Sequence, residues 1–306
     1  MKSLLRALVR LLFKPTMSPR VPLSLQRRGT ALAAVLSRPP HGTTVTSTEL
    51  GGVPALELRT GAIDEHAAVL YLHGGAYVLG GPVTHTGLAA RIGRAAAAPV
   101  YLIDYRLAPE HPFPAALEDA LAAYRKLLEK VPANRIGITG DSAGGGLTLA
   151  TAMAIRDAGL PQPAALAVIS PWTDLTLSGD SMRKLAKADP MLREDWLRDC
   201  AARYAGTTPL EDPRISPLYG NLKDLPPILV HVGSDEVLLS DAERLAERAQ
   251  ATGADLRLHR YDGLWHVFHL HGGQLKEADA AIEELGSFLR QHRQAEVSNT
   301  ADRLTA

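Results

Sequence analysis

One stretch constrains the fold of this 306-residue chain more than any other: residues 135–150, RIGITGDSAGGGLTLA. It starts with a β-branched run, 136–139, which predicts a buried strand, and continues into small residues that predict a helix. Between them stands Ser142, with a glycine two positions before it and another two positions after. So sharp a strand-to-helix turn forces its central residue into a strained backbone conformation, and glycines leave room for the two elements to approach. The pattern predicts a serine hydroxyl held above a sheet edge. A glycine-rich turn with no catalytic role can have the same sequence.

Strand-like and helix-like segments alternate along most of the chain. The predicted strands are 43–49, 54–60, 67–72, 100–104, 136–139, 165–170, 228–232 and 256–261, and the predicted helices are 85–97, 115–130, 147–157, 240–251 and 276–291. Gly51-Gly52 joins the first two strands, which predicts an antiparallel entry. The alternation indicates an α/β protein with a mostly parallel sheet covered by helices on both faces.

The alternation fails in two places, which suggests how the chain is organised. Residues 1–45 predict an N-terminal helical cap segment, and 46–291 a catalytic α/β domain that carries a cap or lid insertion at 172–223. The polar residues 292–306 predict a frayed tail.

Composition excludes some classes of partner. Lys+Arg and Asp+Glu both number 33, so a net charge of about zero gives no electrostatic case for binding nucleic acid. Cys200 is the only cysteine, which permits a reducing compartment, and we expect a cytoplasmic protein. Since there is no run of 18 or more apolar residues, we expect no stable membrane insertion.

The N-terminal residues form a basic stripe on an otherwise apolar helix. Lys2, Arg6, Arg10 and Lys14 recur every four residues. The helix could lie on a membrane surface or dock its apolar face on the protein's own core. We favour docking, because one short amphipathic helix is a weak anchor by itself.

A serine nucleophile needs donors for an oxyanion, and one motif offers them. His73-Gly74-Gly75-Ala76-Tyr77 follows directly on the predicted strand 67–72. Glycines let the backbone approach a substrate closely, so the N–H groups of Gly74 and Gly75 can point at an anion, and the N–H of Ala143 would complete the hole.

A serine nucleophile also needs a base and an acid that orients it, and each should follow a strand. Asp235 lies just after the predicted strand 228–232, and we prefer it to Asp241, which falls inside the start of the next helix. His266 follows the strand 256–261. The order nucleophile, acid, base along the chain is that of α/β-hydrolases.

Histidine is common here, with 11 in the chain, so a metal site was weighed as well. His266, His269 and His271 lie close in sequence, but no carboxylate or cysteine nearby completes a known ligand spacing. We therefore expect neither a metal nor an organic cofactor.

Four motifs in order resemble the hormone-sensitive lipase family of α/β-hydrolases, particularly its small bacterial carboxylesterases. They are HGGAY at 73–77, DYRLAPE at 104–110, GDSAGG at 140–145 and SPWTDL at 170–175, followed by Asp235 and His266. The resemblance implies an eight-stranded, mainly parallel sheet with a helical cap. It also implies that Arg106 and Glu110 brace the oxyanion loop, and we expect Tyr77 and Trp265 to contact substrate.

One departure from that family concerns the pocket. The family often has glycine after the catalytic histidine, whereas this chain has Val267, preceded by Trp265. The pair is similar to the branch that includes monoterpene lactone hydrolase-like enzymes, and a valine here would reshape the pocket beside the base.

The predicted function is hydrolysis of short- to medium-chain carboxylic esters by Ser142, His266 and Asp235 through an acyl-enzyme. Hydrolysis of lactones by the same residues is a near alternative. A non-catalytic binder, like the plant gibberellin receptors that resemble this family, is a rival from another class. Such receptors lack the catalytic histidine, whereas His266 is present here. A peptidase is disfavoured because the chain has no room for a propeller domain, and the resemblance leaves open a homodimer formed through an edge strand.

Overall fold

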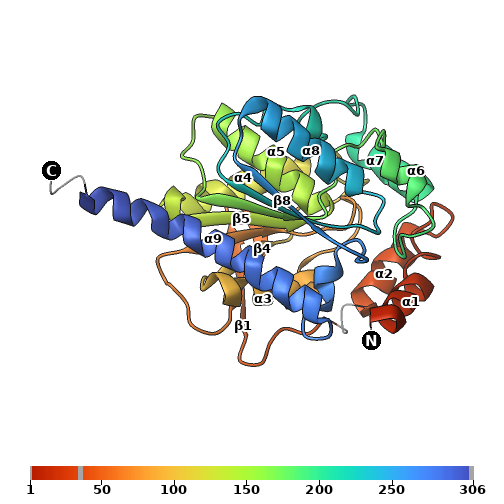
Figure 1. The fold of residues 1–306 in the computed structure, drawn as a ribbon, viewed down its shortest axis with the longest axis horizontal. Helices are drawn as coiled ribbons and strands as arrows, with labels where there is room; N and C mark the ends of the chain where they lie inside the picture. The colour runs from red at the N-terminus through yellow and green to blue at the C-terminus, as the bar shows by residue number, and fades with distance from the viewer. Residues whose placement is uncertain (1, 34–36, 303–306) are drawn as a thin grey trace.

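The computed structural model describes residues 2–33 and 37–302, and its centre is an eight-stranded sheet (Figure 1). The strands are β1 (Thr44–Leu50), β2 (Val53–Arg59), β3 (Ala68–Leu72), β4 (Val100–Ile103), β5 (Ile136–Asp141), β6 (Ala165–Ile169), β7 (Ile228–Gly233) and β8 (Leu256–Tyr261). Their order is β1-β2-β4-β3-β5-β6-β7-β8. From β4 to β8 all neighbours are parallel, while β2 is antiparallel to both β1 and β4. The predicted fold class is therefore confirmed.

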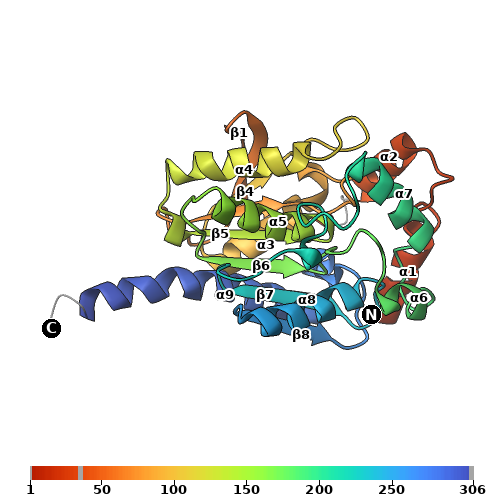
Figure 2. The same ribbon diagram turned by 90° about the horizontal axis from the view of Figure 1, so that it is seen from above.

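Helices cover both faces of the sheet, as Figures 1 and 2 show. One face carries α4 (Ala115–Leu128), α5 (Ala143–Asp157) and α8 (Leu239–Thr252), and the other carries α3 (Pro82–Ala96) and α9 (Lys276–Asp302). Every residue of β3, β5, β6 and β7 is buried, as expected of parallel strands covered on both sides. The helix α9 continues to Asp302, through most of the segment predicted as a tail from residue 292, and residues 303–306 lie outside the described part.

The remaining helices gather at one end of the sheet, beyond the carboxyl ends of the parallel strands (Figure 2). They are α1 (Lys2–Leu12), α2 (Leu23–Ala33), α6 (Asp180–Lys184) and α7 (Glu194–Ala205). Short 3-10 turns complete the chain at η2 (Ala133–Arg135), η3 (Pro217–Tyr219) and η4 (Phe268–His271). In the described part of the chain, no helix is long and apolar enough to cross a membrane.

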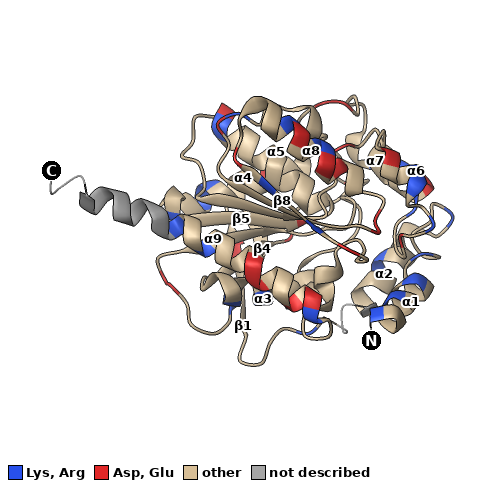
Figure 3. Cartoon of the chain, viewed as in Figure 1, with Lys and Arg blue, Asp and Glu red and all other residues tan. Residues whose placement is uncertain are grey.

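The basic residues of α1, together with Lys14 just after it, reach backbone oxygens of the protein, although Arg10 stays exposed. Figure 3 shows the basic residues along this helix. Arg6 donates to the carbonyl oxygen of Ala188 at 2.7 Å, Arg10 to that of Lys187 at 2.8 Å, and Lys14 to that of Ala186 at 2.6 Å. Positive side chains thus satisfy backbone oxygens just before α7.

The apolar residues of α1 divide into two strips. Val9 is buried in the main core, with Leu5 packed partly against it. Leu4 and Leu11, on the other strip, are 76% and 72% exposed. The expectation that the apolar face docks on the core is therefore only partly correct.

Candidate active site

The turn between β5 and α5 has the strained geometry that its sequence predicts. Ser142 adopts φ 53° and ψ −122°, outside the regions that most residues occupy. Its N–H donates to the carbonyl oxygen of Ile169 on β6 at 2.8 Å, which holds the strained residue in place. A Cβ atom at Gly144 would overlap the carbonyl oxygens of Leu72 and His73, so only glycine lets α5 approach β3.

Ser142 and His266 meet although 124 residues separate them. His266 Nε2 lies 3.0 Å from Ser142 Oγ, within hydrogen-bond reach. The side chains are almost fully buried, with residue exposures of 6% for Ser142 and 2% for His266. The structure thus brings together the predicted nucleophile and base in the geometry that proton transfer from serine requires.

The acid beside His266 is Glu236, not Asp235. Glu236 Oε2 lies 2.7 Å from His266 Nδ1, and the carboxylate is completely buried. Its other oxygen accepts hydrogen bonds from the N–H of Gly233 at 2.7 Å and from Ser170 Oγ at 2.9 Å. A buried charge is tolerated only with such partners, so this carboxylate is well held to orient the imidazole.

Asp235 is positioned differently, and the prediction that it is the acid is wrong. Its carboxylate accepts a hydrogen bond from Arg6 Nη1 of α1 at 2.6 Å and is partly exposed. Neighbouring residues in a turn point in different directions, so one position along the chain changes the partner from His266 to the cap. One sequence signal could have identified Glu236. It directly precedes the apolar residues 237–239, whose burial draws its side chain toward the interior.

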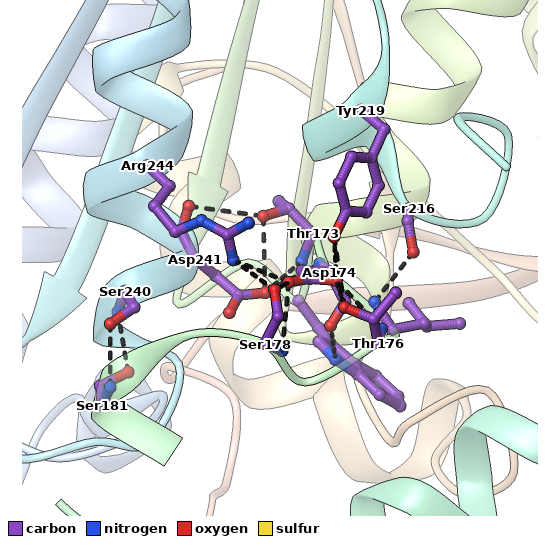
Figure 4. Close-up of polar contacts among 12 residues, drawn as sticks. Thr173, Asp174, Thr176, Ser178, Ser181, Ser216, Tyr219, Ser240, Asp241 and Arg244 are labelled. Atoms are coloured by element: carbon purple, nitrogen blue, oxygen red, sulfur yellow. Dashed lines mark hydrogen bonds and ion pairs between the residues drawn. The ribbon is translucent and has the colours of Figure 1, made fainter. Parts of the chain in front are cut away.

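The rival Asp241 is also excluded as the partner of His266. Figure 4 shows it beside the segment that follows β6, where its Oδ2 accepts the N–H groups of Thr173 at 2.8 Å and Asp174 at 2.9 Å. Burial, together with the negative charge of Asp174, raises the pKa of Asp241 to about 7. Asp174 is itself fully buried and accepts from Arg244 at 2.7 Å. This network anchors the start of the cap insertion on α8.

The proton affinity of His266 reflects two opposing effects. Burial by itself lowers the pKa of an imidazole, because it disfavours the charged form. The hydrogen bond and the negative charge of Glu236 outweigh burial, so the pKa of His266 is raised above its usual value. A protonated His266 is therefore stabilised at this position.

Of the predicted oxyanion donors, two are available and one is not. The N–H of Gly74 donates to Asp141 Oδ1 at 3.1 Å, so it is already engaged. The Asp141 carboxylate is buried beside this loop and also accepts a hydrogen bond from the Tyr71 hydroxyl at 2.7 Å. Among the described residues no acceptor bonds the N–H of Gly75 or that of Ala143. Of the three predicted donors, Gly75 and Ala143 therefore have N–H groups without an acceptor among the described residues, and Gly74 does not.

The oxyanion loop is braced from the segment that follows β4. Tyr105 donates its hydroxyl to the carbonyl oxygen of His73 at 2.6 Å. Glu110 binds Arg27 of α2, at 2.7 Å, and Arg27 in turn donates to the carbonyl oxygen of Val78 at 2.9 Å. The expected role of Glu110 is thus supported through Arg27.

Arg106, the other expected brace, faces away from the loop. It pairs with Asp119 of α4 at 2.7 Å, so it fixes a helix rather than the oxyanion loop.

A pocket opens beside Ser142 and His266, and most of its lining is apolar. The cap, the loop after β3 and the segment after β8 contribute apolar side chains, namely Phe13, Met17, Leu79, Met191, Leu192, Trp196, Val267 and Leu270. The pocket therefore suits an apolar group attached to the reacting carbonyl.

Neither of the two predicted substrate contacts lines this pocket. Tyr77 is buried and its ring stacks on that of Tyr204, with 3.6 Å between centroids. Trp265 is completely buried in the core. Both aromatic rings are therefore part of the hydrophobic core, where their large apolar area is removed from water.

Val267 occupies a backbone conformation that normally favours glycine. Its φ of 48° is left-handed, which is unusual for a β-branched residue. Its N–H donates to Ser170 Oγ at 3.1 Å, the same hydroxyl that binds Glu236. The side chain of Val267, the residue after His266, forms part of the pocket wall.

Of the three histidines weighed as metal ligands, His266 and His269 have separate partners, and the ring of His271 lies against that of Trp265. Both ring nitrogens of His266 are taken by Glu236 and Ser142. His269 Nε2 instead lies 3.2 Å from His231 Nδ1, on the far side of the loop.

Comparisons with known proteins agree with this geometry. A family described as having the alpha/beta hydrolase fold matches residues 69–270. An acetyl-hydrolase of Streptomyces hygroscopicus is 46% identical over 223 residues, which are 72% of this chain and 75% of that protein. A solved esterase of the bacterial hormone-sensitive lipase family is 38% identical with a TM-score of 0.91, covering 95% of this chain and 98% of that one. EstE5, solved after soaking with p-nitrophenyl butyrate, is 41% identical with a TM-score of 0.91, covering 96% and 98%.

The fold, the elbow serine and the buried imidazole–carboxylate pair are those of a hydrolase that works on carboxylic esters. The chain belongs to the α/β-hydrolase family and, within it, to the hormone-sensitive lipase family of esterases.

Proposed function

We propose that this protein is a serine carboxylesterase that works through Ser142, His266 and Glu236 and forms an acyl-enzyme. The observation that carries the proposal is the continuous line of contacts from Ser142 Oγ to His266 Nε2 and from His266 Nδ1 to Glu236, at 3.0 and 2.7 Å. Burying the charged carboxylate of Glu236 costs free energy, and a protein that only bound its ligand would gain nothing from holding that charge next to an imidazole.

The reaction follows from these contacts. His266 takes the proton of Ser142 as its Oγ attacks the ester carbonyl, and Glu236 fixes the tautomer and stabilises the imidazolium. The negative oxygen of the tetrahedral intermediate accepts hydrogen bonds from the N–H groups of Gly75 and Ala143. His266 then gives its proton to the leaving alcohol. Water activated by the same imidazole releases the acid and restores the serine.

The substrate class that we propose is a short- to medium-chain ester. The pocket wall is apolar, so it offers an acyl chain burial without charged contacts. Val267 narrows the space next to the base. Since EstE5 was soaked with p-nitrophenyl butyrate, that ester is a suitable first probe for this chain.

The direct test is Ser142→Ala, assayed on p-nitrophenyl butyrate. We expect kcat to fall on the order of 10⁵-fold, because the nucleophile is lost while the oxyanion donors remain. A fluorophosphonate should label the unsubstituted protein and leave the variant unlabelled. Unchanged turnover in the variant would contradict the proposed role of Ser142 and favour a protein that only binds its ligand.

A panel of lactones and of p-nitrophenyl esters of increasing acyl length separates the closest alternatives. The same residues can open a cyclic ester, so lactone hydrolysis uses the same chemistry on another substrate. We expect kcat/KM to be highest for short and medium acyclic esters. A higher value for lactones would reassign the substrate class and leave the mechanism intact.

A further inference from the structure

A second group of polar side chains lies on the sheet face covered by α9. His231 of β7 and His259 of β8 are direct partners in the parallel register, so their imidazoles stand side by side on one face. Glu284 of α9 reaches both rings: its Oε2 lies 2.9 Å from His259 Nδ1 and 3.6 Å from His231 Nε2. One ligand atom from each of the three residues lies within 4.8 Å of the other two.

The Nε2 atom of His231 has no hydrogen-bond partner among the described residues, although the side chain is completely buried. The other ring nitrogen, Nδ1, lies 3.2 Å from His269 Nε2. Glu284 Oε2 lies 3.6 Å from this nitrogen, beyond hydrogen-bond distance. A cation bound between His231 Nε2 and the carboxylate would give the buried nitrogen a partner.

We propose that His231, His259 and Glu284 form a Zn²⁺ site in which water takes the fourth position. Two imidazoles and one carboxylate are a ligand set that Zn²⁺ favours over Mg²⁺ or Ca²⁺, which prefer oxygen. Zinc–ligand distances of about 2.0–2.2 Å put tetrahedral ligand atoms about 3.4 Å apart. The separations of 2.9 and 3.6 Å between Glu284 Oε2 and the two imidazole nitrogens lie on either side of that value.

The surroundings of the three residues suit such an ion. The Tyr261 hydroxyl donates to Glu284 Oε2 at 2.7 Å, and His269 lies against His231, so two of the ligands have the supporting contacts that orient metal ligands. The side chains of His259 and Glu284 are 46% and 43% exposed, which gives an ion a route from solvent. The bound ion would tie the edge strand β8 to β7 and α9. This role is separate from ester hydrolysis.

The test is calorimetric titration of the EDTA-treated full chain with ZnCl₂, with MgCl₂ as the comparison metal. We expect saturable binding of one Zn²⁺ per chain and none of Mg²⁺. A hundredfold excess over Kd should raise the thermal unfolding midpoint by about 5 °C. Co²⁺ in place of Zn²⁺ should give the visible absorption of a tetrahedral site.

Two variants on the exposed side of the cluster locate the ion without disturbing the core. His259→Ala and Glu284→Gln should each weaken Zn²⁺ binding at least tenfold. Their matched controls are His66→Ala and Glu283→Gln, at exposed positions away from the cluster, and these should bind as the unsubstituted protein does. The proposal is overturned if the unsubstituted chain shows no saturable binding. It is also overturned if both cluster variants keep full affinity, which would mean that zinc binds at other histidines. Neither result affects the proposed esterase mechanism.

Discussion

Two buried histidines of this molecule face a glutamate, yet their proton affinities move in opposite directions. The pKa of His266 is raised, whereas that of His231 is lowered to about 3. Glu236 is fully buried and 2.7 Å from its imidazole, while Glu284 is 43% exposed and 3.6 Å away. Burial disfavours both imidazolium ions, and only a close, desolvated carboxylate offsets that cost.

The two histidine–glutamate pairs therefore suit different chemistry. At His266 the protonated ring is stabilised, so the pair suits a step in which a proton is taken up and returned. At His231 the buried Nε2 atom has no hydrogen-bond partner among the described residues, which suits binding of a cation. The amino acids are the same in both pairs, and the position of the carboxylate decides the chemistry.

Of the substitutions that test this comparison, Glu236→Gln is expected to have the largest effect on activity. The amide keeps the shape but removes the charge that stabilises the imidazolium and can orient the wrong tautomer. We expect kcat/KM for p-nitrophenyl butyrate to fall on the order of 10⁴-fold, as when the corresponding acid of a serine protease is neutralised. Asp235→Asn is the matched control, because Asp235 binds Arg6, and it should retain activity within about threefold. The reverse ranking of the two variants would restore Asp235 as the acid.

The pH dependence of kcat/KM gives the next largest effect. His266 must be neutral to accept a proton, and its pKa is raised, so activity should fall to half at a pH above about 6.5, the usual value for histidine. Below that point the rate should drop about tenfold per pH unit. In Glu236→Gln the largest raising influence is lost, while burial and the charges of Asp189 and Asp141 remain, so the half-point of the residual activity should move to lower pH. A half-point that is the same in both proteins would show that Glu236 does not set the pKa.

The smallest effect expected is on specificity, from Val267→Gly. Glycine accepts the left-handed φ of 48° without strain, and loss of the valine side chain widens the pocket beside His266. We expect the ratio of kcat/KM for octanoate over butyrate esters to rise about tenfold, the effect of one or two methylenes. The half-point of the acidic limb should stay unchanged, because Glu236 still contacts His266. A shifted half-point would mean that Val267 also positions the base through Ser170.

The active site was predictable wherever one local segment carries the constraint. The elbow at Ser142 needs only a strand, a helix and glycines that remove side-chain overlap, and all of these are encoded within a few residues. The same holds for the position of His266 after β8 and for the two-residue turn at Gly51-Gly52, where both residues adopt positive φ. The parallel sheet followed from apolar runs that alternate with helices.

Other features depended on contacts between distant segments, and the sequence could not rank them. Asp235 and Glu236 are adjacent carboxylates in one turn, and which of them meets His266 depends on how that turn packs against Ser170 and the cap. Whether Gly74 offers its N–H to a substrate depends on Asp141, 67 residues further on.

Backbone sterics and strand periodicity act over short distances along the chain. The sheet, the strained backbone of Ser142 and the position of His266 could therefore be predicted from the sequence alone. Only the tertiary structure shows which carboxylate contacts His266, which N–H groups lack an acceptor among the described residues, and that Tyr77 and Trp265 are buried in the core. It also brought His231, His259 and Glu284 together from two strands and a helix. These outcomes depend on burial and on charges a few ångströms apart in space, and neither can be read from spacing along the chain.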